Sequence, residues 1–149
     1  MAIEEGKAAP AFTLKDQTGK SRSLADFKGQ DVVVYFYPKD DTPGCTIESC
    51  TFRDSHTDFQ TAGAEVIGIS SDSPTSHQQF AAKHGLPFTL VSDEGSKVRN
   101  AYGVPSTLGL LPGRVTYIID LEGKVRHIFN SQFNPKAHVS EAMKVLQTL

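Results

Sequence analysis

The chain has no tryptophan, only two cysteines and little charge imbalance among its 149 residues. Its formal net charge is -2, and no run of five like charges occurs, which argues against nucleic acid or an anionic membrane as a partner. No apolar run reaches the roughly 18 residues of a membrane span, and residues 1–10 lack the apolar centre of a signal peptide. Two cysteines are too few for a secreted disulfide scaffold. We therefore expect a reducing compartment, where cysteines tend to be catalytic, redox-active or inert core residues.

The length and the absence of repeats or linkers predict one domain over residues 1–149. Runs of apolar, β-branched and aromatic residues predict strands, and alternating segments predict helices. Strands are expected at 11–14, 20–23, 32–37, 65–70, 88–91, 115–120 and 125–129, the first two forming a hairpin. Helices are expected at 46–62, 74–84, 95–102 and 135–149. This order predicts an α/β domain with a mixed sheet flanked by helices, of which a thioredoxin-like fold is one form among several.

Cys45 lies where the first long strand gives way to a helix, an edge at which chemistry is common in α/β proteins. Thr42 followed by Pro43 suits an N-cap and a first helical residue, which places Cys45 in the first turn. The free N–H groups and the positive end of the helix dipole there favour a thiolate. The alternative is that Cys45 is an inert, buried residue. The Pro-Gly sequence before it and the helix start favour reactivity.

Three neighbours of Cys45 carry weaker signals. The Thr42 hydroxyl lies one turn before Cys45, so it can reach the sulfur and suits binding a peroxide, or it serves only as a cap. Glu48 either orients a basic group or is an ordinary solvated glutamate. Tyr37 either lines a pocket or belongs to the core strand.

Cys50 follows Cys45 by five residues. This spacing is not the Cys-x-x-Cys of disulfide oxidoreductases, and no second cysteine pair exists for a zinc site. Five helical residues rise about 7.5 Å, whereas a disulfide needs Cα atoms within about 6.8 Å. A bond between these cysteines would therefore require the first turns of the helix to unwind.

At these residues the chain resembles the peroxiredoxins, whose active-site pattern Pro-x-x-x-Thr-x-x-Cys stands here as Pro38, Thr42 and Cys45. Residues 35–50 resemble the peroxiredoxin Q (bacterioferritin comigratory protein) branch, which often carries a second cysteine where Cys50 stands. Arg114 matches the arginine that the family places beside the reactive sulfur. The resemblance runs from residue 6 to the C-terminal helix, and residues 111–133 resemble plant-chloroplast and cyanobacterial members.

The resemblance implies a thioredoxin-like fold and a thiol peroxidase that reduces hydrogen peroxide and alkyl hydroperoxides in antioxidant defence. Cys45 would attack the peroxide, Pro38 would shield the pocket, and Thr42 and Arg114 would position the peroxide oxygens. Cys50 would then form an intrachain disulfide with Cys45, which a thioredoxin-like dithiol reduces. No metal or other cofactor is implied. The expected form is a monomer in a bacterial or cyanobacterial cytoplasm, or in a chloroplast if a transit peptide has been removed.

Two other functions compete with this one, namely a redox-sensing or binding module without turnover and a protein disulfide reductase. The combination of Thr42, Cys45 and Arg114 argues against the first, and the missing Cys-x-x-Cys argues against the second. Arg53 and Arg99 either neighbour the site or, as is more common for single arginines, are solvated helix residues. The histidines show no metal-ligand spacing, so surface or half-buried structural roles are expected for all five: His56, His77, His84, His127 and His138.

Overall fold

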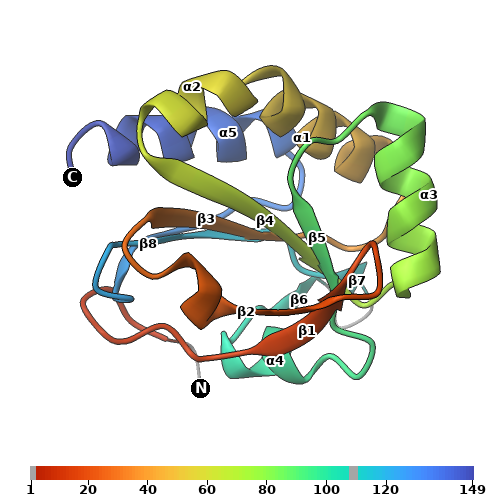
Figure 1. Cartoon of the computed structure of the whole chain (residues 1–149), viewed down its shortest axis with the longest axis horizontal. Helices are drawn as coiled ribbons and strands as arrows, with labels where there is room; N and C mark the ends of the chain where they lie inside the picture. The colour runs from red at the N-terminus through yellow and green to blue at the C-terminus, as the bar shows by residue number, and fades with distance from the viewer. Residues whose placement is uncertain (1–2, 108–110) are drawn as a thin grey trace.

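The computed structural model describes residues 3–107 and 111–149 (Figure 1). Within these residues, seven strands form one mixed sheet in the order β2-β1-β5-β4-β3-β8-β9. Their bounds are β1 Thr13–Asp16, β2 Ser21–Ser23, β3 Asp31–Phe36, β4 Ala64–Ser70, β5 Thr89–Ser92, β8 Val115–Ile119 and β9 Val125–Asn130. The central strands β3, β4 and β5 are parallel, while β8 joins β3 antiparallel and the β1–β2 hairpin joins β5 antiparallel. This is the α/β, thioredoxin-like architecture that the sequence predicts.

Helices cover both faces of the sheet. Figure 1 shows α1, α2 and α5 above the sheet, α3 beside it and α4 below it. Their bounds are α1 Pro43–Asp54, α2 His56–Thr61, α3 Pro74–His84, α4 Lys97–Ala101 and α5 Pro135–Leu146. A 3-10 turn, η1 (Leu24–Phe27), and a small hairpin of β6 (Ser106–Thr107) and β7 (Leu111–Pro112) complete the described elements.

Strand β3 is buried on both faces because its side chains alternate between two cores. Val33 and Tyr35 pack with the side chains of α1, α2, α3 and α5. Val32, Val34 and Phe36 pack with those of η1, α4 and the strands β4, β5, β8 and β9. Burial on both sides explains the continuous apolar run in the sequence. Burial on both faces also fixes the position of β3, and with it the place where the loop before α1 begins.

The structure corrects several expected boundaries. The helix expected at 46–62 begins at Pro43 and breaks at Ser55, whose φ and ψ of -101° and 6° separate α1 from α2. Asp, Ser, His and Thr residues cluster at the break, and all have weak helix propensity. Helix α4 covers only 97–101, and α5 ends at Leu146, leaving Leu149 exposed. The short elements η1, β6 and β7 were not expected.

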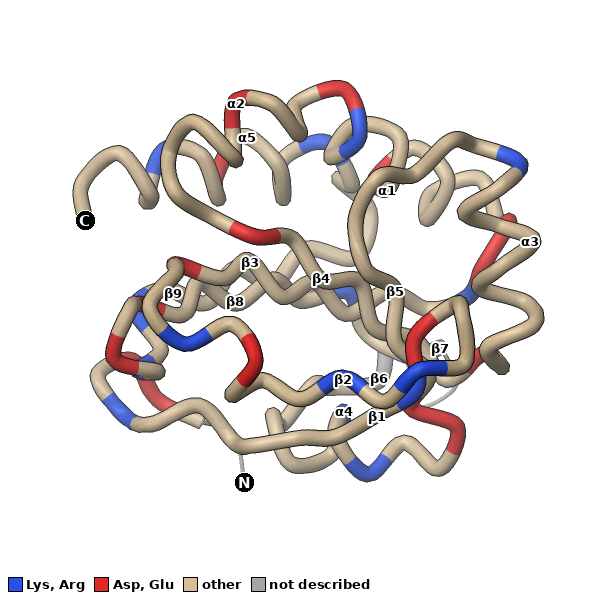
Figure 2. Tube along the Cα trace, viewed as in Figure 1, with Lys and Arg blue, Asp and Glu red and all other residues tan. Residues whose placement is uncertain are grey.

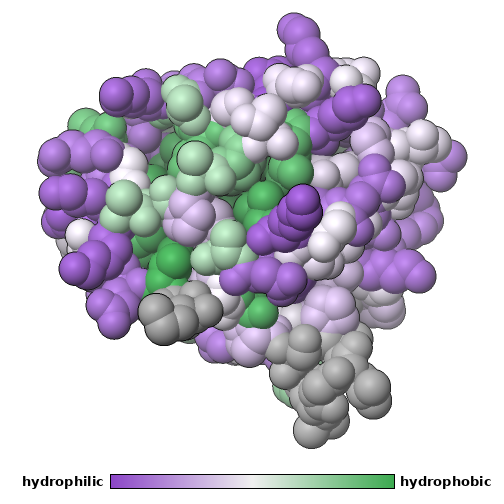
Figure 3. All heavy atoms as spheres, turned by 90° about the horizontal axis from the view of Figure 1, so that it is seen from below, coloured by the Kyte–Doolittle hydropathy of each residue, from purple (hydrophilic) through white to green (hydrophobic). Residues whose placement is uncertain are grey.

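Lys and Arg lie interspersed with Asp and Glu along the described part of the chain (Figure 2). Seen from below, hydrophobic side chains gather on part of the surface (Figure 3). None of the described helices is both long and apolar enough to cross a bilayer. Residues 1–2 and 108–110, which the expected single domain includes, lie outside the described residues.

Candidate active site

Cys45 lies in the first turn of α1, as the sequence predicts. Thr42 is the N-cap residue and Pro43 begins the helix. The Cys45 side chain is almost fully buried, with 1% of its surface exposed. Its sulfur therefore faces the positive end of the helix dipole in a poorly solvated place, where that dipole acts strongly.

Arg114 immediately precedes β8, the strand that pairs with β3, and its side chain reaches the Cys45 sulfur from there. Its Nη2 donates to Cys45 Sγ at 3.5 Å, and its Nε donates to the Gln132 carbonyl at 3.1 Å. A methyl group on Gly44 would lie 3.0 Å from Nη2. The absence of a side chain at Gly44 thus allows the guanidinium to approach the helix start.

Glu48 is fully buried and binds Arg114, so the expectation of a solvated glutamate is wrong and that of an orienting residue fits. Arg114 Nη1 donates to Glu48 Oε1 at 2.7 Å. Burial raises the pKa of Glu48 above its ordinary value, and the Arg114 charge opposes that rise. Glu48 Oε2 has no hydrogen-bond partner in the described part of the chain. The carboxylate therefore acts mainly on Arg114.

His138, from α5, lies behind Glu48 and is fully buried, contrary to the surface or half-buried position expected. Its Nε2 donates to the Ser131 carbonyl at 2.7 Å, and its Nδ1 lies 2.7 Å from the Thr116 hydroxyl and 3.6 Å from Glu48 Oε2. Burial lowers the pKa of His138 to about 4. The neutral ring accepts the Thr116 hydrogen at Nδ1, which leaves Arg114 as the cation facing Glu48.

A cavity of about 470 Å³ opens onto Cys45 and Arg114. Most of its wall is apolar; the lining residues are Pro38, Lys39, Thr42, Gly44, Cys45, Ile47, Arg114, Gln132, Phe133 and Pro135. The Thr42 hydroxyl donates to the Lys39 carbonyl at 2.8 Å rather than capping α1. Pro38, Thr42, Cys45 and Arg114 thus share one cavity, although they come from three segments.

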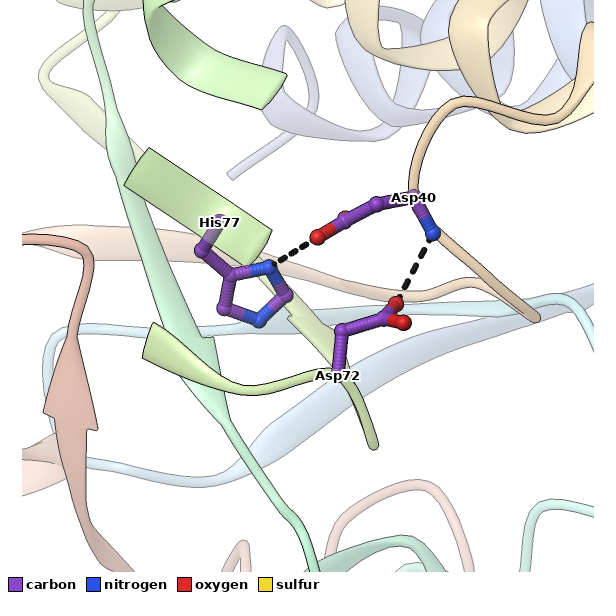
Figure 4. A group of neighbouring side chains, drawn as sticks. All are labelled: Asp40, Asp72 and His77. Atoms are coloured by element: carbon purple, nitrogen blue, oxygen red, sulfur yellow. Dashed lines mark hydrogen bonds and ion pairs between the residues drawn. The ribbon is translucent and has the colours of Figure 1, made fainter. Parts of the chain in front are cut away.

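Tyr37 does not line this cavity. It is fully buried, and its hydroxyl donates to Asp40 Oδ1 at 2.5 Å. Asp40 also accepts from the Ser76 hydroxyl. Its Oδ2 lies 2.7 Å from His77 Nδ1 (Figure 4). The Asp40 backbone N–H donates to Asp72.

His77, from α3, links the Asp40 loop, which precedes α1, to α3 and to β5. Its Nε2 lies 3.0 Å from the Val91 carbonyl, which only accepts, so the ring proton is on Nε2. The His77 ring thus contacts Asp40 on one side and the Val91 carbonyl of β5 on the other. Together with the Tyr37 and Ser76 hydroxyls, which donate to Asp40, it fastens the loop between Pro38 and Thr42 to α3.

Arg99 is buried, with 6% of its surface exposed, so the expectation of a solvated helix residue is wrong and the alternative, a residue that neighbours the site, is right. Its guanidinium contacts main-chain carbonyls at the ends of two segments that form the site. Nothing in the spacing of α4 residues signals this, because the contact depends on where the sheet places α4. Arg53, in contrast, stays partly exposed and bonds Asp54 and the His84 carbonyl.

Cys50 lies in α1 with Cys45 and is partly buried, and both thiols are free. Between them, Glu48 binds Arg114 and the Ser49 hydroxyl bonds Tyr35 at 2.9 Å. The intact helix thus keeps the two cysteines apart, as their spacing predicts.

Residues 6–128 match the AhpC/TSA family, to which the chain belongs. The fold agrees: the crystal structure of the peroxidoxin BcpB from Mycobacterium tuberculosis is 35% identical with a TM-score of 0.91, over 99% of this chain and 98% of the other. A bacterioferritin comigratory protein of Xanthomonas campestris, studied for alkyl peroxide reduction, is 33% identical with a TM-score of 0.85, over 92% and 90% of the two chains.

Within the AhpC/TSA family, the relatives with the higher sequence identity are peroxiredoxin Q proteins. The chloroplastic peroxiredoxin Q of Populus jackii is 58% identical over 99% of this chain and 70% of its own length. That of Suaeda salsa is 59% identical over 99% and 69%. The chain is thus similar to the peroxiredoxin Q proteins, and its activity is that of a thiol-dependent peroxidase.

Proposed function

We propose that Cys45 is the nucleophile of the peroxidase and that Arg114, Thr42 and Pro38 hold the peroxide beside it. The observation that carries this proposal is the 3.5 Å contact from Arg114 Nη2 to Cys45 Sγ at the cavity. A guanidinium beside a sulfur at a helix start favours the thiolate, which is the reactive form. The same guanidinium can stabilise the negative charge that develops on the peroxide.

In the first step, the Cys45 thiolate attacks the hydroxyl oxygen of the hydroperoxide and the O–O bond breaks. The sulfur becomes a sulfenic acid, and the leaving oxygen takes a proton to give water or an alcohol. Because the Thr42 hydroxyl donates its hydrogen to the Lys39 carbonyl, its lone pairs can accept a hydrogen bond from the peroxide O–H. Pro38, which lacks an N–H, contributes an apolar wall.

Cys50 is proposed as the resolving thiol. Its sulfur would attack the Cys45 sulfenic acid, releasing water and forming the Cys45–Cys50 disulfide. A thioredoxin-like dithiol would reduce that disulfide and become oxidised itself. Support comes from the placement of both free thiols in one helix and from the absence of any cysteine after Cys50.

Hydrogen peroxide and alkyl hydroperoxides are the proposed substrates. The apolar wall of the cavity supports the latter, as does the similarity to the Xanthomonas protein studied for alkyl peroxide reduction. We also propose that residues 1–149 work as one domain and as a monomer. A chloroplast, supported by the chloroplastic relatives, or a bacterial or cyanobacterial cytoplasm is the proposed compartment.

The test is peroxide consumption with a thioredoxin system by wild type, Cys45→Ser and Cys50→Ser. A serine hydroxyl is scarcely ionised near neutral pH, so Cys45→Ser should consume no peroxide. Cys50→Ser should consume one equivalent per chain and then stop. Turnover by Cys45→Ser above background would remove Cys45 from its proposed role, and continued thioredoxin-dependent cycling by Cys50→Ser would remove Cys50 from its own.

A further inference from the structure

The catalytic cavity lies where two neighbouring strands stop pairing. β3 and β8 are in register from Val32 and Ile119 as far as Phe36 and Val115. In the residue after that pair, the Tyr37 N–H donates to the Ile69 carbonyl of β4 on the other side of β3. Pro38 follows and has no N–H to offer. The residues proposed to hold the peroxide, Pro38 and Arg114, therefore lie just outside the ladder that fixes β3 against β8.

Arg99 spans this gap from the other face of the sheet. Helix α4 lies below the sheet in Figure 1, whereas α1, with Cys45, lies above it. Arg99 Nη2 donates to the Tyr37 carbonyl at 2.7 Å, and Nη1 donates to the Gly113 carbonyl at 2.9 Å. These carbonyls belong to the residues immediately before Pro38 and Arg114. One planar guanidinium thus joins both segments by two hydrogen bonds.

Arg99 is itself held in place. The backbone N–H groups of Val98 and Arg99 donate to the Asp93 carboxylate at 3.2 and 2.8 Å. The guanidinium carbon lies 5.7 Å from the centre of the Phe36 ring. At Gly113, an added Cβ would lie 2.2 Å from the Pro105 carbonyl oxygen, so this segment has no room to shift toward Pro105.

Burying a cation is unfavourable unless its hydrogen bonds are made. Burial lowers the pKa of Arg99, while the nearby Asp93 and Cys45 oppose that change. The two carbonyls, left without the guanidinium, would be buried acceptors at the end of a broken ladder. Packing alone thus gives no reason for a charged side chain here, whereas a planar, two-donor bridge does.

We propose that Arg99 is a positioning residue of the peroxidase, which sets the separation between the Pro38 and Arg114 segments and so the contact of Arg114 with the sulfur and the peroxide. The proposal rests on the proposed roles of Cys45 and Arg114. Arg99 acts through main-chain carbonyls and does not line the cavity. What matters is the fork geometry of the guanidinium, because a point charge cannot hold two carbonyls apart in one plane.

The test compares Arg99→Lys and Arg99→Ala with the control Lys97→Ala, which removes an exposed cation from the same helix. All are made in the Cys50→Ser background. Because the chain has no tryptophan, formation of the Cys45 sulfenic acid is followed by quenched flow and mass spectrometry. Misplacement of a reacting group by about 1 Å can slow a step about 100-fold. We expect losses of that order in both Arg99 variants and none in the control.

Chemical rescue separates geometry from charge. Ethylguanidine added to Arg99→Ala should raise the rate of Cys45 oxidation by peroxide at least tenfold, because its planar guanidinium can bridge both carbonyls. Ethylammonium carries the same charge and should not. Alkylation of Cys45 by iodoacetamide needs a thiolate but does not need the residues that hold a peroxide. In the Arg99 variants its rate should therefore fall far less than the rate of peroxide oxidation. In the wild-type chain, restricted rotation of the Arg99 guanidinium should give separate Nη–H resonances.

Peroxide oxidation of Arg99→Lys within twofold of the parent rate would overturn the proposal, as would equal rescue by ethylammonium. A parallel loss of alkylation and peroxide rates would assign Arg99 a charge effect instead, and averaged Nη–H resonances in the wild type would exclude a fixed bridge. If the parent chain forms no sulfenic acid, the proposed role of Cys45 fails, and the role of Arg99 fails with it. A normal parent with unaffected variants overturns the role of Arg99 alone.

Discussion

Glu48 and Arg114 are 66 positions apart in sequence, yet their side chains meet at 2.7 Å with both almost fully buried. The same guanidinium donates to Glu48 with Nη1 and to Cys45 with Nη2. Glu48 therefore determines the orientation in which Arg114 presents its other donor to the sulfur. The helix that carries Cys45, the proposed nucleophile, thus also carries the residue that orients Arg114.

Arg114→Lys should keep a positive charge and lose the ability to bind Glu48 and Cys45 at once. We expect the second-order rate of Cys45 oxidation to fall at least about tenfold, with a greater loss in Arg114→Ala. The rate of peroxide-driven sulfenic acid formation checks this. Arg126, a half-exposed arginine on β9, provides the control Arg126→Lys. A lysine variant as fast as wild type would mean that charge alone suffices.

Glu48→Gln and Glu48→Ala should separate the hydrogen bond from the charge. Alanine leaves a buried, unpaired Arg114, and breaking a buried pair in this way costs about 3–5 kcal/mol in the free energy of unfolding. Glutamine keeps an acceptor for Nη1 and should cost less. Denaturant titrations followed by circular dichroism measure both variants. Equal losses for the two would contradict a role for the retained acceptor.

Oxidation should unwind the segment of α1 between its cysteines, because a Cys45–Cys50 bond does not fit an intact helix. The Glu48–Arg114 and Tyr35–Ser49 hydrogen bonds lie within that segment and should weaken with it. Amide exchange over residues 42–52 should rise in oxidised wild type and stay unchanged in peroxide-treated Cys50→Ser. Full protection of these amides in a chain whose disulfide is confirmed by mass spectrometry would show that the helix argument is wrong.

His138 should make stability depend on pH on the acid side. Burial lowers its folded pKa from 6.5 to about 4. Between these values the unfolded chain binds the His138 proton more readily than the folded chain, so the contribution of His138 to the free energy of unfolding falls as pH drops from about 6.5 to about 4. The loss should reach about 3 kcal/mol. Glu48, whose pKa is raised by burial, contributes in the opposite direction, so the comparison of slopes between wild type and His138→Gln carries the test. His138→Gln should have a flatter profile over this range, measured by urea titration at each pH. Identical slopes would exclude His138 as the source.

Much of the fold follows from the sequence because it rests on local rules. The apolar runs predict β3, β4 and β8 to within a residue, and the Thr42-Pro43 pair predicts the start of α1 and the position of Cys45 in it. The sequence does not predict the break at Ser55, because an apolar pattern continues across it to Phe59 and only the weak helix propensities of the intervening residues oppose a continuous helix.

The sequence by itself determined the position of Cys45 in its helix and the spacing that separates Cys45, the proposed nucleophile, from Cys50, since both depend on residues close together in the chain. Only the tertiary structure decided that Glu48 faces Arg114, that Arg99 bridges two carbonyls, and that Asp40 is fastened to His77. These contacts join residues from different elements. They exist because the sheet order brings β3, β4 and β8 together and because buried polar groups must find partners there.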